Sequence, residues 1–282
     1  MQYCVDVPNF GVWSDPRRFA EFAVDCETAG WDGISVWDHI LVWDGAEVAD
    51  PWVLLAAAAM VTDRIRLMTM VTPVPRRHPW KLARECVSLD LLSAGRLTLG
   101  VGIGWPTDPE FTRFHGETDL RARADMLDEG LEVLTGLWTG DPFGFTGEHY
   151  QMEEVTFRPR PVQQPRIPIW VAAMWPRRRP VRRAALWDGI VPLLYDFEKD
   201  EFLPPTAGAM AEISEYVREH RTAVEPFDMA VSGTHRPGED LTGWHRELEE
   251  VGVTWWRDGW MPGTDVTAED WYHDVLKGPP TR

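Results

Sequence analysis

Two polar residues, Asp38 and His39, come at the end of a short apolar run that begins at residue 33. The imidazole of a histidine gains and loses a proton near neutral pH, so it suits proton transfer in a catalytic site. A neighbouring carboxylate can hold such a ring in one orientation. We therefore interpret His39 as a catalytic proton donor or acceptor oriented by Asp38. An ordinary loop histidine bonded to backbone is the other interpretation.

Five arginines occupy residues 177–183 in a chain whose formal net charge is −17. They open a predicted helix, where the helix dipole disfavours cations. An anion bound there, most simply a phosphate, would relieve that mismatch. We expect Arg177 and Arg178 to hold such an anion, and a solvated face paired with nearby carboxylates is the alternative.

A glycine-rich segment at 100–105 follows another apolar run. It fails the dinucleotide-binding pattern G-x-G-x-x-G, because Trp105 stands where the last glycine is required. Gly102, Ile103 and Gly104 favour a backbone that a flat or phosphorylated group approaches closely. A barrel rim that needs small residues explains the glycines equally well.

The 16 tryptophans are unusual for a chain of 282 residues. Several lie on predicted helix faces, where they pack against the core. Trp13, Trp43, Trp105 and Trp175 instead lie in loops or at strand ends. If these four face one mouth, they line a pocket that favours an apolar or flat substrate.

A fold must position these residues, and the hydrophobic pattern of the chain predicts one. Eight near-continuous apolar runs, typical of strands covered on both faces, alternate with helical patterns. The runs are residues 2–8, 33–38, 65–71, 97–103, 168–173, 189–194, 227–232 and 253–258. Eight strand–helix units predict an α/β fold, a (β/α)8 TIM barrel in which reacting groups follow the strand ends. An open doubly wound sheet is the alternative.

One stretch, at about 141–167, breaks this rhythm with turn residues between two short strand-like runs. We predict a β-hairpin inserted after the fourth helix, and a single barrel domain over 1–282. The first helix is predicted to begin with Asp15 as N-cap and Pro16 in its first turn.

Composition excludes several other classes of protein. With 45 acidic and 28 basic residues the chain lacks the positive field of a nucleic-acid surface. Three scattered cysteines and eight histidines without ligand spacing favour neither a disulfide scaffold nor a metal site. The start of the chain resembles no export signal and the longest apolar run is too short to cross a membrane, so we expect a cytoplasmic protein.

Several motifs together resemble the luciferase-like monooxygenase family, which includes flavin- and deazaflavin-dependent oxidoreductases. They are Pro8-Asn9-Phe10-Gly11, Glu27-Thr28-Ala29-Gly30-Trp31-Asp32, Val36-Trp37-Asp38-His39, the stretch 95–105, Leu137-Trp138-Thr139-Gly140, the stretch 145–150 and Pro168-Ile169-Trp170-Val171-Ala172-Ala173. The match runs to about residue 195 at consistent spacing.

The resemblance implies a barrel that holds FMN or coenzyme F420 at its C-terminal mouth, commonly in a homodimer. Asp38, His39 and Trp43 resemble the pattern of F420-dependent members, so they imply F420 with a catalytic His39 and a Trp43 beside the substrate. The family also implies a bulge with a non-proline cis peptide near Thr69. The residues implied to contact the cofactor are Asp38, Thr69, Met70, Val71, Gly102, Ile103, Gly104, Ala172, Ala173, Met174, Arg177 and Arg178.

The chain departs from the family at two places. Met174 and Trp175 replace glycines that are common after the fifth strand, and Trp105 replaces a glutamate that serves as an acid in some F420 dehydrogenases. The nearest carboxylates are Asp108 and Glu110. Besides F420-dependent hydride transfer, the alternatives are a monooxygenase that uses O2 and reduced FMN from a partner reductase, and an inactive barrel that only binds a ligand.

Overall fold

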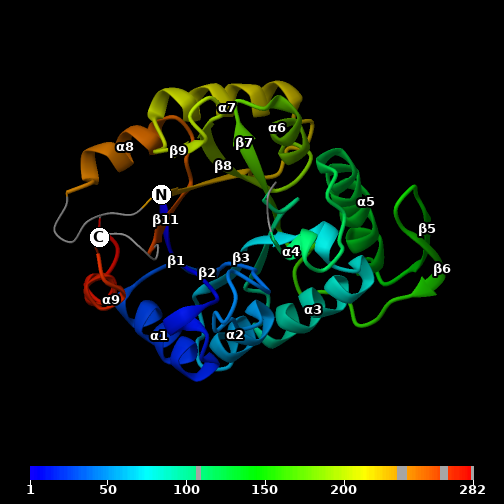
Figure 1. The fold of residues 1–282 in the computed structure, drawn as a ribbon, viewed down its shortest axis with the longest axis horizontal. Helices are drawn as coiled ribbons and strands as arrows, with labels where there is room; N and C mark the ends of the chain where they lie inside the picture. The colour runs from blue at the N-terminus through cyan, green and yellow to red at the C-terminus, as the bar shows by residue number, and fades with distance from the viewer. Residues whose placement is uncertain (106–108, 234–239, 261–265, 281–282) are drawn as a thin grey trace.

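Eight parallel strands close into a barrel in the computed structural model, which describes residues 1–105, 109–233, 240–260 and 266–280 (Figure 1). Around the barrel the strands are β1 (Gln2–Val7), β2 (Gly33–Val36), β3 (Arg66–Pro73), β4 (Leu97–Gly102), β7 (Ile169–Trp175), β8 (Gly189–Asp196), β10 (Asp228–Gly233) and β11 (Trp255–Gly259). β8 pairs with β10, and β11 returns to β1. The predicted (β/α)8 barrel is confirmed, and the open-sheet alternative is wrong.

Helices surround the barrel, as the apolar stripes of the sequence predict. They are α1 (Pro16–Ala29), α2 (Pro51–Ala59), α3 (Pro79–Leu92), α4 (Pro109–Thr112), α5 (Leu120–Trp138), α6 (Arg178–Ala184), α7 (Ala207–His220), α8 (Thr242–Glu250) and α9 (Ala268–Val275), with 3-10 turns η1 (Gly11–Trp13) and η2 (Val74–Arg76). The Asp15 side chain accepts the N–H of Arg17 at the start of α1, so the predicted cap is confirmed.

The predicted insertion is a two-stranded antiparallel hairpin, β5 (Pro142–Thr146) and β6 (Gln151–Thr156). It extends from the end of α5, away from the barrel (Figure 1). The carboxylate of Glu129 on α5 accepts the backbone N–H groups of residues 148–150, which ties the hairpin turn back to the helix. The hairpin therefore leaves the barrel mouth unaltered.

A three-residue strand that the sequence analysis did not predict, β9 (Glu201–Leu203), pairs antiparallel with β8. The run Glu201-Phe202-Leu203 is too short for a period-2 pattern to be recognised. Its place on the edge of β8 brings Phe202 to the barrel mouth, where it lines the cavity described below.

Side chains that alternate along the strands fill the barrel interior. Cys4, Met68, Met70, Trp170, Val191, Ala230 and Trp255 form one cluster of buried residues. Space is tight at Gly100, where an added Cβ would clash with the carbonyl oxygen of Thr69. All three cysteines are buried. Within the described ranges no helix is long and apolar enough to cross a bilayer.

Candidate active site

A cavity of about 340 Å³ opens at the C-terminal mouth of the barrel. Its walls come from the ends of β2, β3, β4, β7 and β8 and from the loops that follow them. The residues around it are Trp37, Asp38, His39, Met70, Val71, Pro73, Gly102, Ile103, Gly104, Trp105, Leu120, Leu127, Ala172, Ala173, Met174, Arg177, Pro180, Arg183, Leu193 and Phe202. Most are apolar, so the cavity favours a flat organic group over a hydrated one.

A bulge in β3 forms one wall of this cavity. The register with β4 shifts between Thr69 and Thr72, and the Met70–Val71 peptide bond is cis without a proline. The expected bulge with a non-proline cis peptide is therefore confirmed. Met70 and Val71 line the cavity, whereas Thr69 does not, because its hydroxyl turns away and donates to the carbonyl of Gly100 at 3.1 Å. The Thr69 side chain therefore does not face the cavity, contrary to the expectation that it contacts the cofactor.

The glycine loop at the end of β4 forms a second wall. A Cβ added at Gly102 would lie 3.0 Å from the Val71 side chain. Gly104 has φ +79°, and a Cβ there would clash with the Phe111 ring. Both glycines are thus needed for close approach of backbone to neighbouring groups. Across the cavity, Ala172, Ala173 and Met174 of β7 complete the surface.

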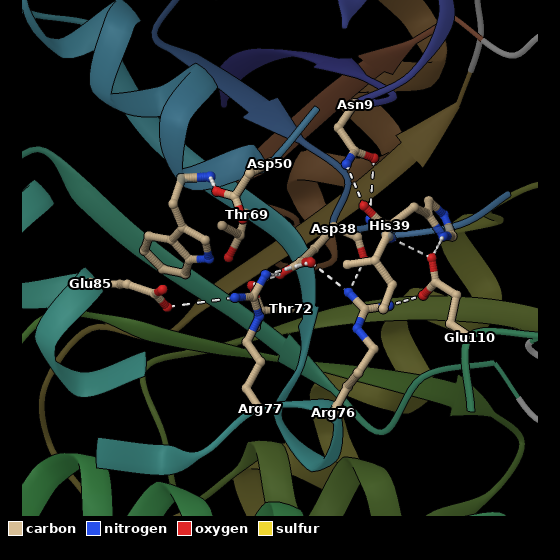
Figure 2. A network of polar contacts seen from close by, with 12 residues as sticks. Asn9, Asp38, His39, Asp50, Thr69, Thr72, Arg76, Arg77, Glu85 and Glu110 are labelled. Carbon is tan, nitrogen blue, oxygen red and sulfur yellow. Dashed lines mark hydrogen bonds and ion pairs between the residues drawn. The ribbon is translucent and has the colours of Figure 1, made fainter. Parts of the chain in front are cut away.

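Asp38 lies at the centre of a network of charged groups (Figure 2). It is 3% exposed. Its carboxylate accepts the Thr72 hydroxyl at 2.8 Å and the Arg77 guanidinium at 2.8 and 2.9 Å, and it forms an ion pair with Arg76. A buried carboxylate needs such partners to remain charged. Asp38 is therefore held by two arginines and a threonine.

Glu110, rather than Asp38, contacts the ring of His39. Oε1 of Glu110 lies 3.2 Å from Nδ1 of His39 and accepts the backbone N–H groups of Ile40 at 2.6 Å and Leu41 at 2.9 Å. Its other oxygen pairs with Arg76, which also pairs with Asp38. The expectation that Asp38 orients His39 is wrong, because the two arginines occupy the Asp38 carboxylate and α4 delivers Glu110 to the ring instead.

The network continues past Asp38 to α3. Arg77 reaches Glu85 at 3.5 Å, and Glu85 in turn meets Lys81 at 2.5 Å on the helix surface. Burial alone would lower the pKa of Arg77, but the facing carboxylates, Asp38 first, raise it above its usual value. The Arg77 guanidinium therefore stays charged.

A model of the luciferase-like monooxygenase family matches residues 8–240, most of the chain. The chain belongs to this family. The Asp38-His39 motif, the β3 bulge and the glycine loop all fall inside the matched range.

Two curated relatives of this chain have named activities. An F420-dependent glucose-6-phosphate dehydrogenase of Amycolatopsis mediterranei is 34% identical over 177 residues, 62% of this chain and 51% of that protein. The oxygenase component of a flavin-dependent trigonelline monooxygenase from Acinetobacter baylyi is 36% identical over 127 residues, 45% of this chain and 35% of that protein. The matched segments thus span about half the relatives' length or less.

A solved structure of an F420-dependent secondary alcohol dehydrogenase has the same fold. It superposes with a TM-score of 0.77 at 17% identity and covers 98% of this chain and 97% of that one. The similarity in fold therefore extends over nearly the whole chain.

The arginines that follow β7 separate into different roles in this luciferase-like barrel. Arg177 lines the cavity and stacks over Phe197 at 4.3 Å. Arg178 does not line it: its guanidinium lies between Trp175 at 4.1 Å and Tyr216 at 4.8 Å. The expectation that both face one anion is therefore wrong for Arg178, because successive residues at a helix start point in different directions.

Two of the three remaining arginines of this run have acidic partners, as the alternative interpretation expects. Arg179 pairs with Asp125 and Arg183 with Asp128, both on α5, whereas Arg182 donates to the Tyr216 hydroxyl at 3.3 Å. Arg183 also lines the cavity, but with its charge already balanced.

Of the four tryptophans expected to line the pocket, Trp105 does so, packed against Phe202 at 5.2 Å. The other three do not. Trp13 is buried, with its ring centroid 4.4 Å from that of Phe22. Trp43 is 54% exposed and does not line the cavity. Trp175 is buried instead, with its ring under the Arg178 guanidinium at 4.1 Å.

Several cavity residues escaped the sequence analysis. The sequence analysis places Trp37 in a motif but does not predict it as a cavity residue. It also does not predict four apolar cavity residues as part of the site: Leu120, Leu127, Leu193 and Phe202. Their apolar side chains carry no signal that distinguishes a cavity wall from a core. Asp108 lies outside the described residues. Within the described part of the chain, no group of histidine, cysteine and acidic residues could hold a metal ion.

Proposed function

We propose that this luciferase-like protein is an F420-dependent oxidoreductase that transfers a hydride to or from a small, apolar or flat organic substrate. The observation that carries the proposal is the cavity itself. It places a titratable histidine, His39, opposite apolar walls at the mouth where barrel enzymes bind their substrates. When bound, the deazaflavin supplies or accepts the hydride at its C5 atom.

The residues around the cavity fit a flat tricyclic ring. The β3 bulge at Met70 and Val71 and the glycine loop at Gly102 leave a slot whose sides carry few polar groups. A phosphorylated tail needs a cation, and Arg177 provides one at the rim. We propose that Met70, Val71, the stretch 102–104 and the stretch 172–174 hold the ring, and that Arg177 meets the phosphate.

His39 is the group we propose for proton transfer. The Glu110 carboxylate accepts from Nδ1, so Nδ1 carries a proton, and the other ring nitrogen, Nε2, is the atom we propose to meet the substrate. Asn9 fixes the backbone of the same residue: its amide donates to the His39 carbonyl at 2.7 Å and accepts the His39 N–H at 3.2 Å. The ring is therefore oriented from both its side chain and its backbone.

The preference for F420 over FMN rests on sequence. It is supported by the Trp37-Asp38-His39 motif and by the identity with an F420-dependent glucose-6-phosphate dehydrogenase. The exposed position of Trp43, outside the cavity, gives that residue no part in the proposal. The substrate class is inferred from the apolar walls, and a sugar phosphate would need a further cation besides Arg177 and the balanced Arg183.

The test is a pair of cofactor titrations followed by a turnover assay. The purified protein is titrated with F420 and with FMN, and tight binding of F420 alone is expected. The complex is then assayed with cyclic ketones and alcohols. His39→Gln should remove at least about 99% of the turnover while F420 binding persists. His78→Gln, at the start of α3 against Trp80, is the matched control. Tight FMN binding without F420 binding would refute the proposal.

A second candidate is a monooxygenase that uses reduced FMN and O2 in the same cavity. The identity with the oxygenase component of a flavin-dependent monooxygenase supports it. Oxygen consumption with reduced FMN and an apolar substrate distinguishes the two. Uptake no faster than that of free reduced flavin would count against this candidate.

A further inference from the structure

We propose that Glu110 is a positioning residue that keeps His39 in its doubly protonated, imidazolium form at neutral pH, so that the resting site is set to donate a proton from Nε2. The inference goes beyond the hydride transfer proposed above, which leaves the direction of the proton open. It concerns the protein without cofactor and can therefore fail while the proposed function stands.

The first support is direct contact. The Glu110 carboxylate is 1% exposed and lies 3.2 Å from Nδ1 of His39. An opposite charge at this distance favours the charged form of an imidazole, and burial of the carboxylate limits screening by solvent. Because Glu110 also accepts the backbone N–H groups of Ile40 and Leu41, it stays ionised and in place.

The second support is the order in which opposite charges follow one another along the network (Figure 2). Three carboxylates, Glu110, Asp38 and Glu85, alternate with two guanidinium groups, Arg76 and Arg77. The outer end at Glu85 is balanced by Lys81, which is largely exposed. The inner end is a carboxylate that faces His39, so an imidazolium continues the alternation of charges into the cavity.

Several other charged groups around the mouth have partners of their own. On the loop that carries His39, Asp44 pairs with Arg113, which follows α4, at the surface. Below the mouth, Asp6 bonds to Trp37 and pairs with Arg257. Across the cavity, Arg177 disfavours a charged His39, and Arg183 pairs with Asp128. The Glu110 carboxylate contacts the ring directly, at 3.2 Å from Nδ1.

The third support is that the ring remains open to solvent. The His39 side chain is 34% exposed, whereas Glu110 is fully covered. A proton given from Nε2 to a substrate atom breaks the N–H bond and leaves a neutral imidazole. Solvent can then return the proton. The carboxylate does not titrate in this cycle and acts only through the ring.

The experiment is a pH titration of the histidine ring signals by NMR on protein labelled with 13C at the ring Cε1, without cofactor. The chain has eight histidines, and the His39 signal is the one missing in His39→Gln. We expect its titration midpoint to lie above about pH 7, higher than the usual histidine value of about 6.5. A midpoint below about pH 7 leaves the ring mostly neutral at neutral pH and overturns the proposal, and this reading needs no variant at the network.

Two variants test the cause. Glu110→Gln keeps an oxygen acceptor for the loop but removes the charge, and it should lower the midpoint by about one pH unit, a tenfold change in proton affinity. Glu85→Gln removes the same charge at the far end of the network and should lower it much less. Equal shifts in the two variants, or none in Glu110→Gln, would mean that the contact with Glu110 does not set the charge of His39.

Discussion

Nδ1 of His39 and Oε1 of Glu110 lie 3.2 Å apart although 71 positions separate them in the chain. His39 follows β2, whereas Glu110 lies on α4, beyond β4. Closure of the barrel brings the ends of these two strands to the same mouth, with β3 between them. The relationship makes Glu110 the partner of the His39 ring and leaves Asp38 to hold two arginines.

Arg177 and Arg178 should differ in their effect on cofactor affinity. Arg177→Ala removes the cation at the cavity rim and should weaken F420 binding at least about tenfold, because charge-assisted hydrogen bonds to phosphate are strong. Arg178→Ala, which removes a group stacked on Trp175 and Tyr216, is the matched control and should leave affinity nearly unchanged. Fluorescence titration measures the F420 affinity of both variants. Equal losses of affinity would contradict the proposal that Arg177, and not Arg178, meets the phosphate.

Substitution of Trp105 should affect the KM for substrate, whereas substitution of Trp43 should not. Trp105 lines the cavity, so Trp105→Ala should raise the KM for a cyclic ketone several-fold by removing apolar contact area. Trp43 packs on Phe10 outside the cavity, at 5.4 Å, and Trp43→Ala should leave that KM close to the wild-type value. Steady-state kinetics at saturating cofactor provide the comparison. A larger effect from Trp43 would place the substrate outside the cavity.

Gly100→Ala should destabilise the protein. The added Cβ would meet the Thr69 carbonyl oxygen and the Met70 sulfur at the bulge, and overpacking of this kind costs about 1–3 kcal/mol. Gly208, in the first turn of α7, has no atom within 4 Å of an added Cβ, so Gly208→Ala should be neutral or stabilise by up to about 1 kcal/mol. Urea unfolding followed by circular dichroism measures whether each variant loses or gains free energy of unfolding. Equal free energies of unfolding for the two variants would refute the steric argument.

Glu27 should contribute to stability in a pH-dependent way. Partial burial favours its neutral form, but the N–H groups of Asp63, Arg64 and Ile65 outweigh this and lower its pKa below 4.5. A carboxyl group with a lowered folded-state pKa stabilises above pH 4.5 and loses that contribution as pH falls through the folded-state value.

Glu27→Gln should therefore lower the free energy of unfolding by about 1–2 kcal/mol at pH 7 and by much less near pH 3. Glu132→Gln, at an exposed position on α5, serves as the control and should have little effect at either pH. Thermal unfolding across this pH range measures the difference. A deficit of the same size at pH 3 and pH 7 would show that the charge of Glu27 is not its cause.

The sequence by itself determined the barrel, the hairpin insertion and the location of the mouth. Continuous apolar runs and period-3.6 hydrophobic patterns are local, and each strand or helix carries its pattern within its own residues. The helix cap at Asp15 was predicted from a local residue pattern. The bulge near Thr69 was predicted from the family resemblance. His39 was found because a polar residue at the end of a buried strand stands out.

Only the tertiary structure decided which side chains meet. Trp13 and Trp105 are both tryptophans in loops after strands, yet one packs against Phe22 and the other lines the cavity. Adjacent arginines, Arg177 and Arg178, point to different surroundings. Glu110 reaches His39 because a four-residue helix turns its carboxylate inward. Such directions depend on loop geometry and on contacts between distant segments, and no local pattern of residue types encodes them.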